Sequence, residues 1–324
     1  LKTPADAGVL GKMSIFISGS VAYDTILNFD GKFANHLLQD GLERINLTFQ
    51  TPCMAKNYGG CAANIAYSLK VCGGEPLIVT TVGKDAADYL EHLKALGIRT
   101  DAIQIIKDSF TAQAFITTDT LGNQITSFHE GAMALAHQAL PSSKEKLDYS
   151  IVTPTGTHVM KAHTCYLKQK GIPIIWDMGQ ASAYVTREDI FWFIDHVDVV
   201  TLSSYEWDVF KEKTGLSLKE VSNKLLALIV TDGSRGAWLY TNGESEHFDA
   251  LSVEEPFYPV GCGDAFRGGL LRALSLGWDW ENAMHLATLM GAIKAKSPQA
   301  QGYSIDKIAI ARLFRRAFGE EISL

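Results

Sequence analysis

Three short apolar runs determine how this chain can fold: IPIIWD at residues 172–177, VDVVTL at 197–202 and ALIVTDG at 227–233. Each run is nearly continuous in apolar residues, which is typical of parallel strands that are covered on both faces. Between the second and third runs, residues 204–214 and about 218–226 have the pattern of helices. Strands and helices that alternate in this way predict an open, mostly parallel, doubly wound α/β sheet with helices on both faces.

The same alternation extends toward both ends of the chain. Residues 13–20 (MSIFISGS) predict a buried first strand, and residues 77–83 predict another. Helices are predicted at residues 64–72, 86–97, 263–276, 280–296 and 306–317. We therefore expect one catalytic domain over residues 13–324, preceded at residues 1–12 by a tag or an extension.

Three other segments alternate polar and apolar residues instead: 43–50, 111–118 and 124–129. This alternation predicts half-buried antiparallel strands. We expect them to form a small β-lid, drawn from about residues 24–56 and 103–130. The lid strands either pair between two subunits, giving a homodimer, or simply cover the pocket of one subunit; the sequence leaves both open.

Composition and charge restrict the possible functions. The net charge is −7 and the pI is about 5.7, which argues against a general binder of nucleic acids or anionic membranes. The sequence contains no stretch of about 18 apolar residues, so we expect no transmembrane helix. The five cysteines are odd in number and form no C-x-x-C pair, so we expect reduced thiols in the cytoplasm, without disulfides or zinc. The expected environment of Cys53, Cys61, Cys72 and Cys165 is a buried one.

The strongest chemical signal is PVGCGDAFRGGLL at residues 259–271. Gly261 and Gly263 flank Cys262, and Asp264 opens a predicted amphipathic helix. A glycine turn at a helix N-terminus directs several N–H groups at one point, which suits a phosphate. Asp264 would then be the general base for a substrate hydroxyl. The alternative is that Asp264 only caps the helix and the glycines only form a turn.

Two further features can recognise a sugar. Gly59 and Gly60 permit a close approach of the backbone, and Asn64 can hydrogen-bond a hydroxyl. Asp24 comes just after the first predicted strand, where ligands of open α/β sheets bind, and its carboxylate can accept bonds from two ribose hydroxyls. The structural alternatives are a packing role for Asn64 and a local turn formed by Asp24.

In this order and at these positions, the three features resemble the ribokinase-like (PfkB) family of sugar and nucleoside kinases, over nearly the whole chain from Met13. The resemblance implies ATP and Mg²⁺, with a small-molecule acceptor. It implies that Asp264 deprotonates the accepting hydroxyl and that the backbone N–H groups of Gly261, Cys262 and Gly263 face the γ-phosphate.

On the nucleotide side, SSYEW at residues 203–207 falls where the family carries N-x-x-E. Ser203 replaces the Asn, and Glu206 is implied to contact the metal through water. The resemblance also places Thr231, Gly233 and Gly236 near ATP. The guanidinium of Arg267, one helical turn beyond Asp264, would itself add a positive charge toward the phosphates; the alternative is a surface arginine.

Tyr258 and Val260 depart from the family pattern where many relatives bind a monovalent cation, so dependence on that ion does not follow from the resemblance. Stretches such as QITSFHEGAM at residues 124–133 are similar to bacterial adenosine kinase-like members. They imply phosphorylation of the 5′-hydroxyl of adenosine, with Phe115 and Phe128 stacking on the base and Gln113 bonding its edge. The aromatic rings can equally be lid core.

Other functions remain open or are disfavoured. A sugar kinase, or a kinase-derived nucleoside-binding protein of low activity, stays as an alternative. No G-x-G-x-x-G follows the first strand and no G-x-x-x-x-G-K-[ST] occurs, which argues against a dinucleotide-dependent oxidoreductase and a Walker-type kinase.

Overall fold

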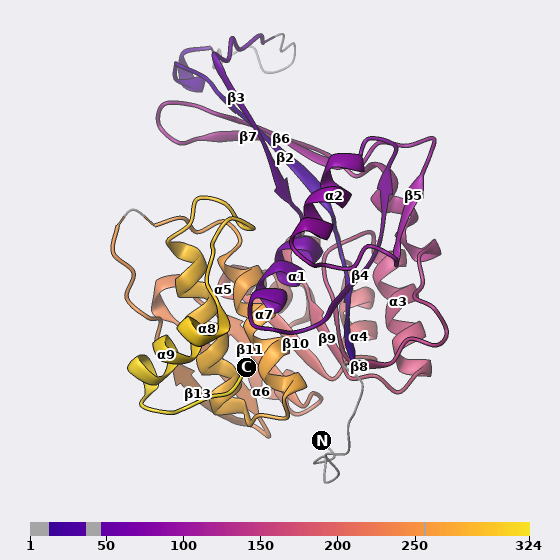
Figure 1. The fold of residues 1–324 in the computed structure, drawn as a ribbon, viewed down its shortest axis with the longest axis vertical. Helices are drawn as coiled ribbons and strands as arrows, with labels where there is room; N and C mark the ends of the chain where they lie inside the picture. Colours follow the sequence, from indigo (N-terminus) through magenta and orange to yellow (C-terminus); the bar gives the residue numbers. More distant parts are fainter. Residues whose placement is uncertain (1–12, 37–46, 256) are drawn as a thin grey trace.

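The computed structural model describes residues 13–36, 47–255 and 257–324, so the expected tag or extension at residues 1–12 lies outside it. A large twisted sheet runs through the molecule (Figure 1). Its strand order is β13-β12-β11-β10-β9-β8-β1-β4-β5. The strands are β1 (Ser14–Ser18), β4 (Pro76–Gly83), β5 (Ile103–Ile106), β8 (Leu147–Val152), β9 (Ile174–Asp177), β10 (Val199–Ser203), β11 (Ala227–Thr231), β12 (Ala237–Thr241) and β13 (Glu244–Phe248).

Only β12 and β13 run antiparallel to their neighbours in this sheet. The doubly wound, mostly parallel fold predicted from the apolar runs is therefore confirmed. The chain adds β4 and β5 on one side of β1 and later adds β8 to β11 on the other side. The strand order thus reverses between β1 and β8, and open α/β sheets bind ligands outside the carboxyl ends of strands at such a point.

Helices cover both faces of the large sheet. One face carries α1 (Cys61–Val71), α2 (Ala87–Ala95), α7 (Cys262–Ser275), α8 (Trp280–Ala295) and α9 (Lys307–Phe318), and the other carries α3 (Thr157–Gln169), α4 (Arg187–Ile194), α5 (Ser204–Thr214) and α6 (Leu218–Ser222). Successive residues of β1 point to opposite faces, so Ile15 and Ile17 join the first core while Phe16 joins the second.

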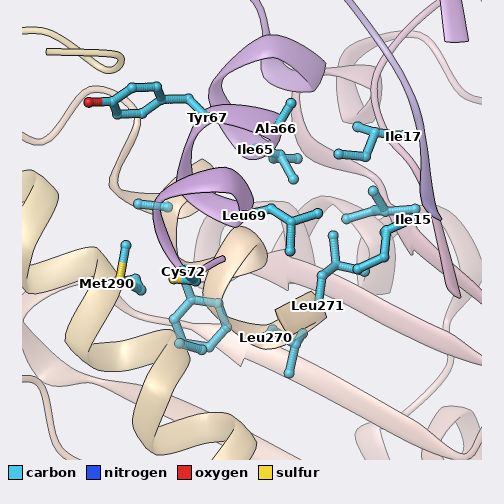
Figure 2. Packing of buried hydrophobic residues seen from close by; sticks show 14 of the residues in the cluster. Ile15, Ile17, Ile65, Ala66, Tyr67, Leu69, Cys72, Leu270, Leu271 and Met290 are labelled. Atoms are coloured by element: carbon cyan, nitrogen blue, oxygen red, sulfur yellow. The ribbon is translucent and has the colours of Figure 1, made fainter. Parts of the chain in front are cut away.

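Helix α7 lies between α1 and α8, and two glycines make this close packing possible. A Cβ on Gly268 would lie 2.5 Å from Cβ of Ser68 in α1, and one on Gly269 would lie 2.8 Å from the carbonyl oxygen of Leu286 in α8. Beyond them, Leu270 and Leu271 lie in the same core as Leu69 and Ile15 (Figure 2). The Gly-Gly pair in FRGGLL therefore fixes how deeply the helix that carries Asp264 is seated.

A second sheet of four strands extends away from the large one (Figure 1). Its order is β3-β2-β6-β7, and we call it the lid sheet: β2 (Ala22–Asn28), β3 (Cys53–Gly59), β6 (Ala112–Thr118) and β7 (Gln124–His129). β6 and β7 pair antiparallel as expected, but β6 also pairs in parallel with β2, and all six residues of β7 are exposed where half-burial was expected. The strand predicted at residues 43–50 is also misplaced: residues 43–46 lie outside the described residues, 47–50 are not in a strand, and β3 follows at Cys53.

Smaller differences concern helix ends and cysteines. Helix α1 begins at Cys61, three residues before the predicted start, and α6 ends at Ser222 rather than near residue 226. Cys72 is buried as expected, but Cys61 is only half-buried and Cys53 and Cys165 are exposed; all five cysteines are free thiols. Within the ranges that the structure describes, no helix combines the length and apolar character needed to cross a membrane.

Candidate active site

The turn before α7 has the geometry of an anion-binding site. Gly261 is the N-cap residue with φ of 85°, a left-handed conformation that favours glycine. The amide of Cys262 is used by the carbonyl oxygen of Pro259 at 3.1 Å, and Ala265 donates to Gly261 at 3.0 Å. Helix geometry leaves the amides of Gly263 and Asp264 without an intrahelical acceptor. Because Gly261 is the cap, the alternative that Asp264 serves as the N-cap is wrong.

Asp264 is joined to Asn64 of α1. The Asn64 Nδ2 donates to Oδ2 of Asp264 at 2.8 Å, and its Oδ1 accepts from Nε2 of Gln301 at 2.9 Å. Burial raises the pKa of the Asp264 carboxyl, while the Asn64 hydrogen bond and the positive charges of Arg267 and Lys294 act against that rise. A carboxylate with a raised pKa is a stronger base than a solvated one.

The start of α1 is built differently from the start of α7. Gly60 has φ of 92°, and a Cβ there would lie 2.5 Å from the carbonyl oxygen of Ser20. Ser20 also accepts from the first-turn amides: its Oγ from Cys61 at 3.0 Å and its carbonyl oxygen from Ala62 at 3.1 Å. With these donors occupied, the first turn of α7 offers the better phosphate site of the two.

Asp24 lies inside strand β2 and not in a turn, so the local-turn alternative is wrong. Gly59 of the neighbouring strand leaves space for its carboxylate, since a Cβ on Gly59 would lie 2.2 Å from Oδ2 of Asp24. Burial first, and the negative charge of Asp264 second, raise the Asp24 pKa to about 6. The structure thus brings Asp24, Asn64 and Asp264 into one site.

The lid residues do not all face this site. In the paired registers, Asp24 stands beside Ala114, which stands beside Phe128, so Asp24 and Phe128 share one face of the lid sheet. Gln113 and Phe115 alternate with Ala114 and point to the opposite face, where Gln113 Nε2 donates to Oγ1 of Thr25 at 2.6 Å. The expectation that Phe115 and Phe128 form one aromatic wall, with Gln113 beside them, is therefore corrected.

The residues expected on the nucleotide side lie together at the carboxyl ends of β10 and β11. Ser203 and Thr231 end these strands as paired neighbours. Ser203 caps α5, accepting from the amide of Glu206 at 3.3 Å, while Glu206 Oε2 accepts from the amide of Ser203 at 2.6 Å. Gly233 (φ 56°) and Gly236 (φ 94°) form the turn that follows β11.

Arg267 connects the turn before α7 to the carboxyl end of strand β9. Its side chain is 7% exposed and its Nη2 lies 2.6 Å from Oδ1 of Asp177, which ends strand β9. A Cβ on Gly263 would lie 2.7 Å from Arg267 Nη1, so the guanidinium sits against the turn. The charge of Glu206 also acts on both members of this pair. The surface-arginine alternative is therefore wrong.

Several residues of the site were not among those predicted from the sequence. Asp177 stands at the end of a predicted strand, and that position was the available signal for it. Gln301 carried no local signal, because its partners Asn64 and Tyr89 are brought near only by the fold, and the same holds for the contact of Lys294 with Tyr258. Gln301 also donates to the hydroxyl of Tyr89 at 2.8 Å, and that hydroxyl donates to the carbonyl oxygen of Gly59 at 2.5 Å.

Comparison with known proteins identifies relatives of the whole chain. The profile of the pfkB family carbohydrate kinases matches residues 31–308. A nucleoside kinase of Methanocaldococcus jannaschii is 28% identical over 304 residues, covering 92% of this chain and 96% of that protein. A Burkholderia thailandensis nucleoside kinase in complex with inosine is 38% identical, with a TM-score of 0.85, covering 95% of this chain and 99% of its own. Its complex with ADP-inosine gives a TM-score of 0.83 at 39% identity, covering 95% of this chain and 97% of its own.

Proposed function

The chain belongs to the pfkB family of carbohydrate kinases, and on that basis we propose that it transfers the γ-phosphoryl group of ATP to the 5′-hydroxyl of a purine nucleoside, with adenosine as the first substrate to test. The observation that carries the proposal is the hydrogen bond between Asn64 and Asp264. It links residues suited to hold a ribose with a carboxylate suited to deprotonate its hydroxyl.

The ribose is proposed to lie between the lid sheet and α1. Asp24 accepts from the vicinal 2′- and 3′-hydroxyls, and the close backbone at Gly59 and Gly60 leaves room for the sugar. Asn64 reaches the same ring from α1. A ribose fixed at these hydroxyls directs its primary 5′-hydroxyl toward Asp264.

Phosphoryl transfer then requires a base and an array of donors. Asp264 takes the proton of the 5′-hydroxyl as the oxygen attacks the γ-phosphorus in line; the bond from the γ-phosphorus to the β–γ bridging oxygen breaks and ADP leaves. The amides of Gly263 and Asp264 in the first turn of α7, together with that of Gly261, stabilise the charge on the transferred group. The Cys262 amide stays bonded to the carbonyl oxygen of Pro259. Fixed donors of this kind contribute about 3 kcal/mol each in enzymes that use an oxyanion hole.

ATP is proposed to lie along the carboxyl ends of β10 and β11, with Ser203, Thr231, Gly233 and Gly236 around it. Arg267 adds a positive charge behind Gly263; its Nε is buried and has no hydrogen-bond partner among the described residues. Mg²⁺, bound to the phosphates, would neutralise part of their charge. The Glu206 carboxylate suits this ion through water, because Mg²⁺ prefers oxygen ligands and retains water.

The choice of a purine rests on the 38% identical relative, which was solved with inosine. Phe128 supports it, since the ring lies on the same lid face as Asp24 and is 54% exposed. An exposed ring on that face is available to stack on a flat base.

The first experiment is an ATP-dependent phosphorylation panel with adenosine, inosine, cytidine, ribose and fructose. We expect the highest kcat/KM for a purine nucleoside and a 5′-monophosphate as the product. Preference for a free sugar would contradict the nucleoside assignment. Nucleoside binding without turnover in Mg·ATP would instead identify a binding protein.

Asp264→Asn tests the base directly, because it keeps the shape of the side chain and removes the basic oxygen. We expect kcat to fall by roughly 10³-fold, while the nucleoside Kd measured by calorimetry changes only a few-fold. Turnover within a few-fold of wild type would refute Asp264 as the base.

A further inference from the structure

A buried lysine lies directly beneath the turn before α7. Lys294 belongs to the last turn of α8 and is fully buried. It is the only lysine among the buried charged residues in the part of the chain that the structure describes. An ammonium group is costly to bury unless it is paired or hydrogen-bonded, so its surroundings indicate what it does.

Two backbone carbonyl groups converge on this ammonium. Lys294 Nζ donates to the carbonyl oxygen of Tyr258 at 3.0 Å and to that of Ser297 at 2.8 Å. The carbonyl of Tyr258 also accepts from Sγ of Cys262 at 3.3 Å. The lysine therefore joins the segment before the turn to the loop that follows α8.

The aliphatic part of the Lys294 side chain lies close to the turn. A Cβ on Gly261 would lie 3.5 Å from Cε of Lys294 and 2.7 Å from Cβ of Ala300. The positive charge acts on both Cys262 and Asp264, lowering the pKa of each against the effect of burial. A fixed cation thus stands behind the amides that are proposed to receive the phosphoryl group.

Many relatives in the family bind a monovalent cation at the positions that correspond to residues 258–260, and this chain does not fit one there. Carbonyl oxygens are the ligands that a potassium ion takes in proteins. Here the carbonyl oxygens of Tyr258 and Ser297 are already engaged by Lys294 Nζ. An ion and the ammonium cannot occupy the same position between these two oxygens.

We propose that the Lys294 ammonium is a covalently tethered replacement for a monovalent cation, which positions the turn from Tyr258 to Gly263 and makes phosphoryl transfer independent of potassium. The kinetic part of this inference rests on the proposed function. Lys294 is a positioning residue, because it acts through the turn and not on the substrate.

Two variants separate the charge from the packing. Lys294→Ala leaves a space that a small cation can enter, and Lys294→Met fills the space with an apolar chain of similar length. The control is Lys296→Ala, at an exposed lysine two residues further on. Each protein is assayed with saturating Mg·ATP and nucleoside in choline chloride, potassium chloride or ammonium chloride at constant ionic strength.

We expect wild type and Lys296→Ala to change by less than about two-fold among the three salts. In choline chloride, the kcat of Lys294→Ala should fall roughly 10²-fold, which is the effect of removing one oxyanion donor. In potassium or ammonium chloride, its kcat should recover at least about ten-fold, which is part of that same loss. Lys294→Met should lose as much and recover nothing. Three results would overturn the inference. Potassium could strongly activate wild type, Lys294→Ala could be fully active in choline chloride, or neither potassium nor ammonium could restore its activity.

Thermal unfolding separates this inference from the proposed function, because it needs no turnover. An ion that binds only the folded protein raises Tm with its concentration. Potassium and ammonium should raise the Tm of Lys294→Ala above its value in choline, and should not do so for wild type. If wild type phosphorylates no nucleoside but this pattern holds, the proposed function fails and the cation replacement stands. A potassium-specific rise in the Tm of wild type would overturn the replacement.

Discussion

The side-chain amide of Asn64 donates a 2.8 Å hydrogen bond to Asp264, joining α1 to α7 across two hundred residues of sequence. The amide orientation is fixed from both sides. An ionised carboxylate only accepts hydrogen bonds, so the Nδ2 must face Asp264, and Gln301 donates to the Oδ1 on the other side. Asn64 therefore supports the ionised form of Asp264 and fixes where its oxygen lies.

Replacing Asn64 by Asp should change the titration of the base. The substitution places a second carboxyl group within hydrogen-bonding distance of Asp264. Two carboxyl groups at such a short distance share a proton, which raises one of their two pKa values. We expect the acidic limb of the pH profile of kcat/KM to move up by at least about one pH unit, with turnover recovering as the pH rises. Lost activity without displacement of the limb would indicate a merely structural role for Asn64.

The two lid aromatic residues should respond differently to truncation. Phe128 lies on the face of Asp24, whereas Phe115 lies on the opposite face. Phe128→Ala should raise the KM for the nucleoside by roughly ten-fold, the effect of losing about 1.4 kcal/mol, and leave the KM for ATP nearly unchanged. Phe115→Ala is the matched control and should alter the nucleoside KM by less than about two-fold, well under that same interval. Equal effects of the two changes would contradict the assignment of lid faces.

The large sheet could be predicted because its signals are local. Strands β9, β10 and β11 are short apolar runs, and the predicted bounds of α5 are confirmed. Ser203 and Glu206 form a capping box at its start, and Gly215 ends it with φ of 75°. Each signal lies within a few residues of the element that it defines.

The lid sheet was predicted less well because its pairing is not local. Strand β2 pairs with β3 and with β6, which follow it by about 30 and 90 residues. Alternation alone indicates that a strand is half-buried, but the register decides which side chains share a face. For that reason Phe115 and Phe128 were assigned to a common wall that the register does not permit.

The same reason explains which site residues were found. Glycine turns and a carboxylate at a helix start are local patterns, so Gly60, Gly261 and Asp264 could be singled out. Arg267 bonds Asp177, 90 residues away, and one of the two partners of Lys294, Tyr258, is 36 residues away. Physical chemistry predicts that a buried cation needs partners, but the sequence alone does not say which ones.

Gly60 should tolerate alanine far less well than another glycine with positive φ whose surroundings are open. Both Gly60 and Gly171 have positive φ, at 92° and 68°. A Cβ on Gly60 would meet the backbone of Ser20 at 2.5 Å and that of Ala22 at 2.7 Å, whereas nothing lies within 4 Å at Gly171. We expect Gly171→Ala to cost about 1 kcal/mol from the left-handed conformation alone. Gly60→Ala should cost at least about twice that. Urea unfolding measures both values, and equal losses would contradict the steric argument.

Asp24→Asn should lower activity and raise stability, and the gain should depend on pH. The folded protein raises the pKa of Asp24 to about 6 from 3.8, so the folded state binds the proton more tightly than the unfolded state does. The associated stability is fully present below about pH 4 and is lost as the pH rises through about 6. At 1.36 kcal/mol per pKa unit, wild type then carries a cost of about 1–3 kcal/mol above pH 7.

The neutral side-chain amide that this variant carries at position 24 avoids that cost, because it has no charged form to desolvate. Asp24→Asn should therefore be more stable than wild type at pH 8, and the difference should vanish as the pH falls from 6 toward 4. Chemical denaturation at a series of pH values measures the difference, with Asp30→Asn, at an exposed aspartate, as the control. The nucleoside KM should rise as well, since the ribose hydroxyls lose a charged acceptor. A stability gain that is the same at pH 4 and pH 8 would show that the carboxylate of Asp24 is not desolvated in the folded protein.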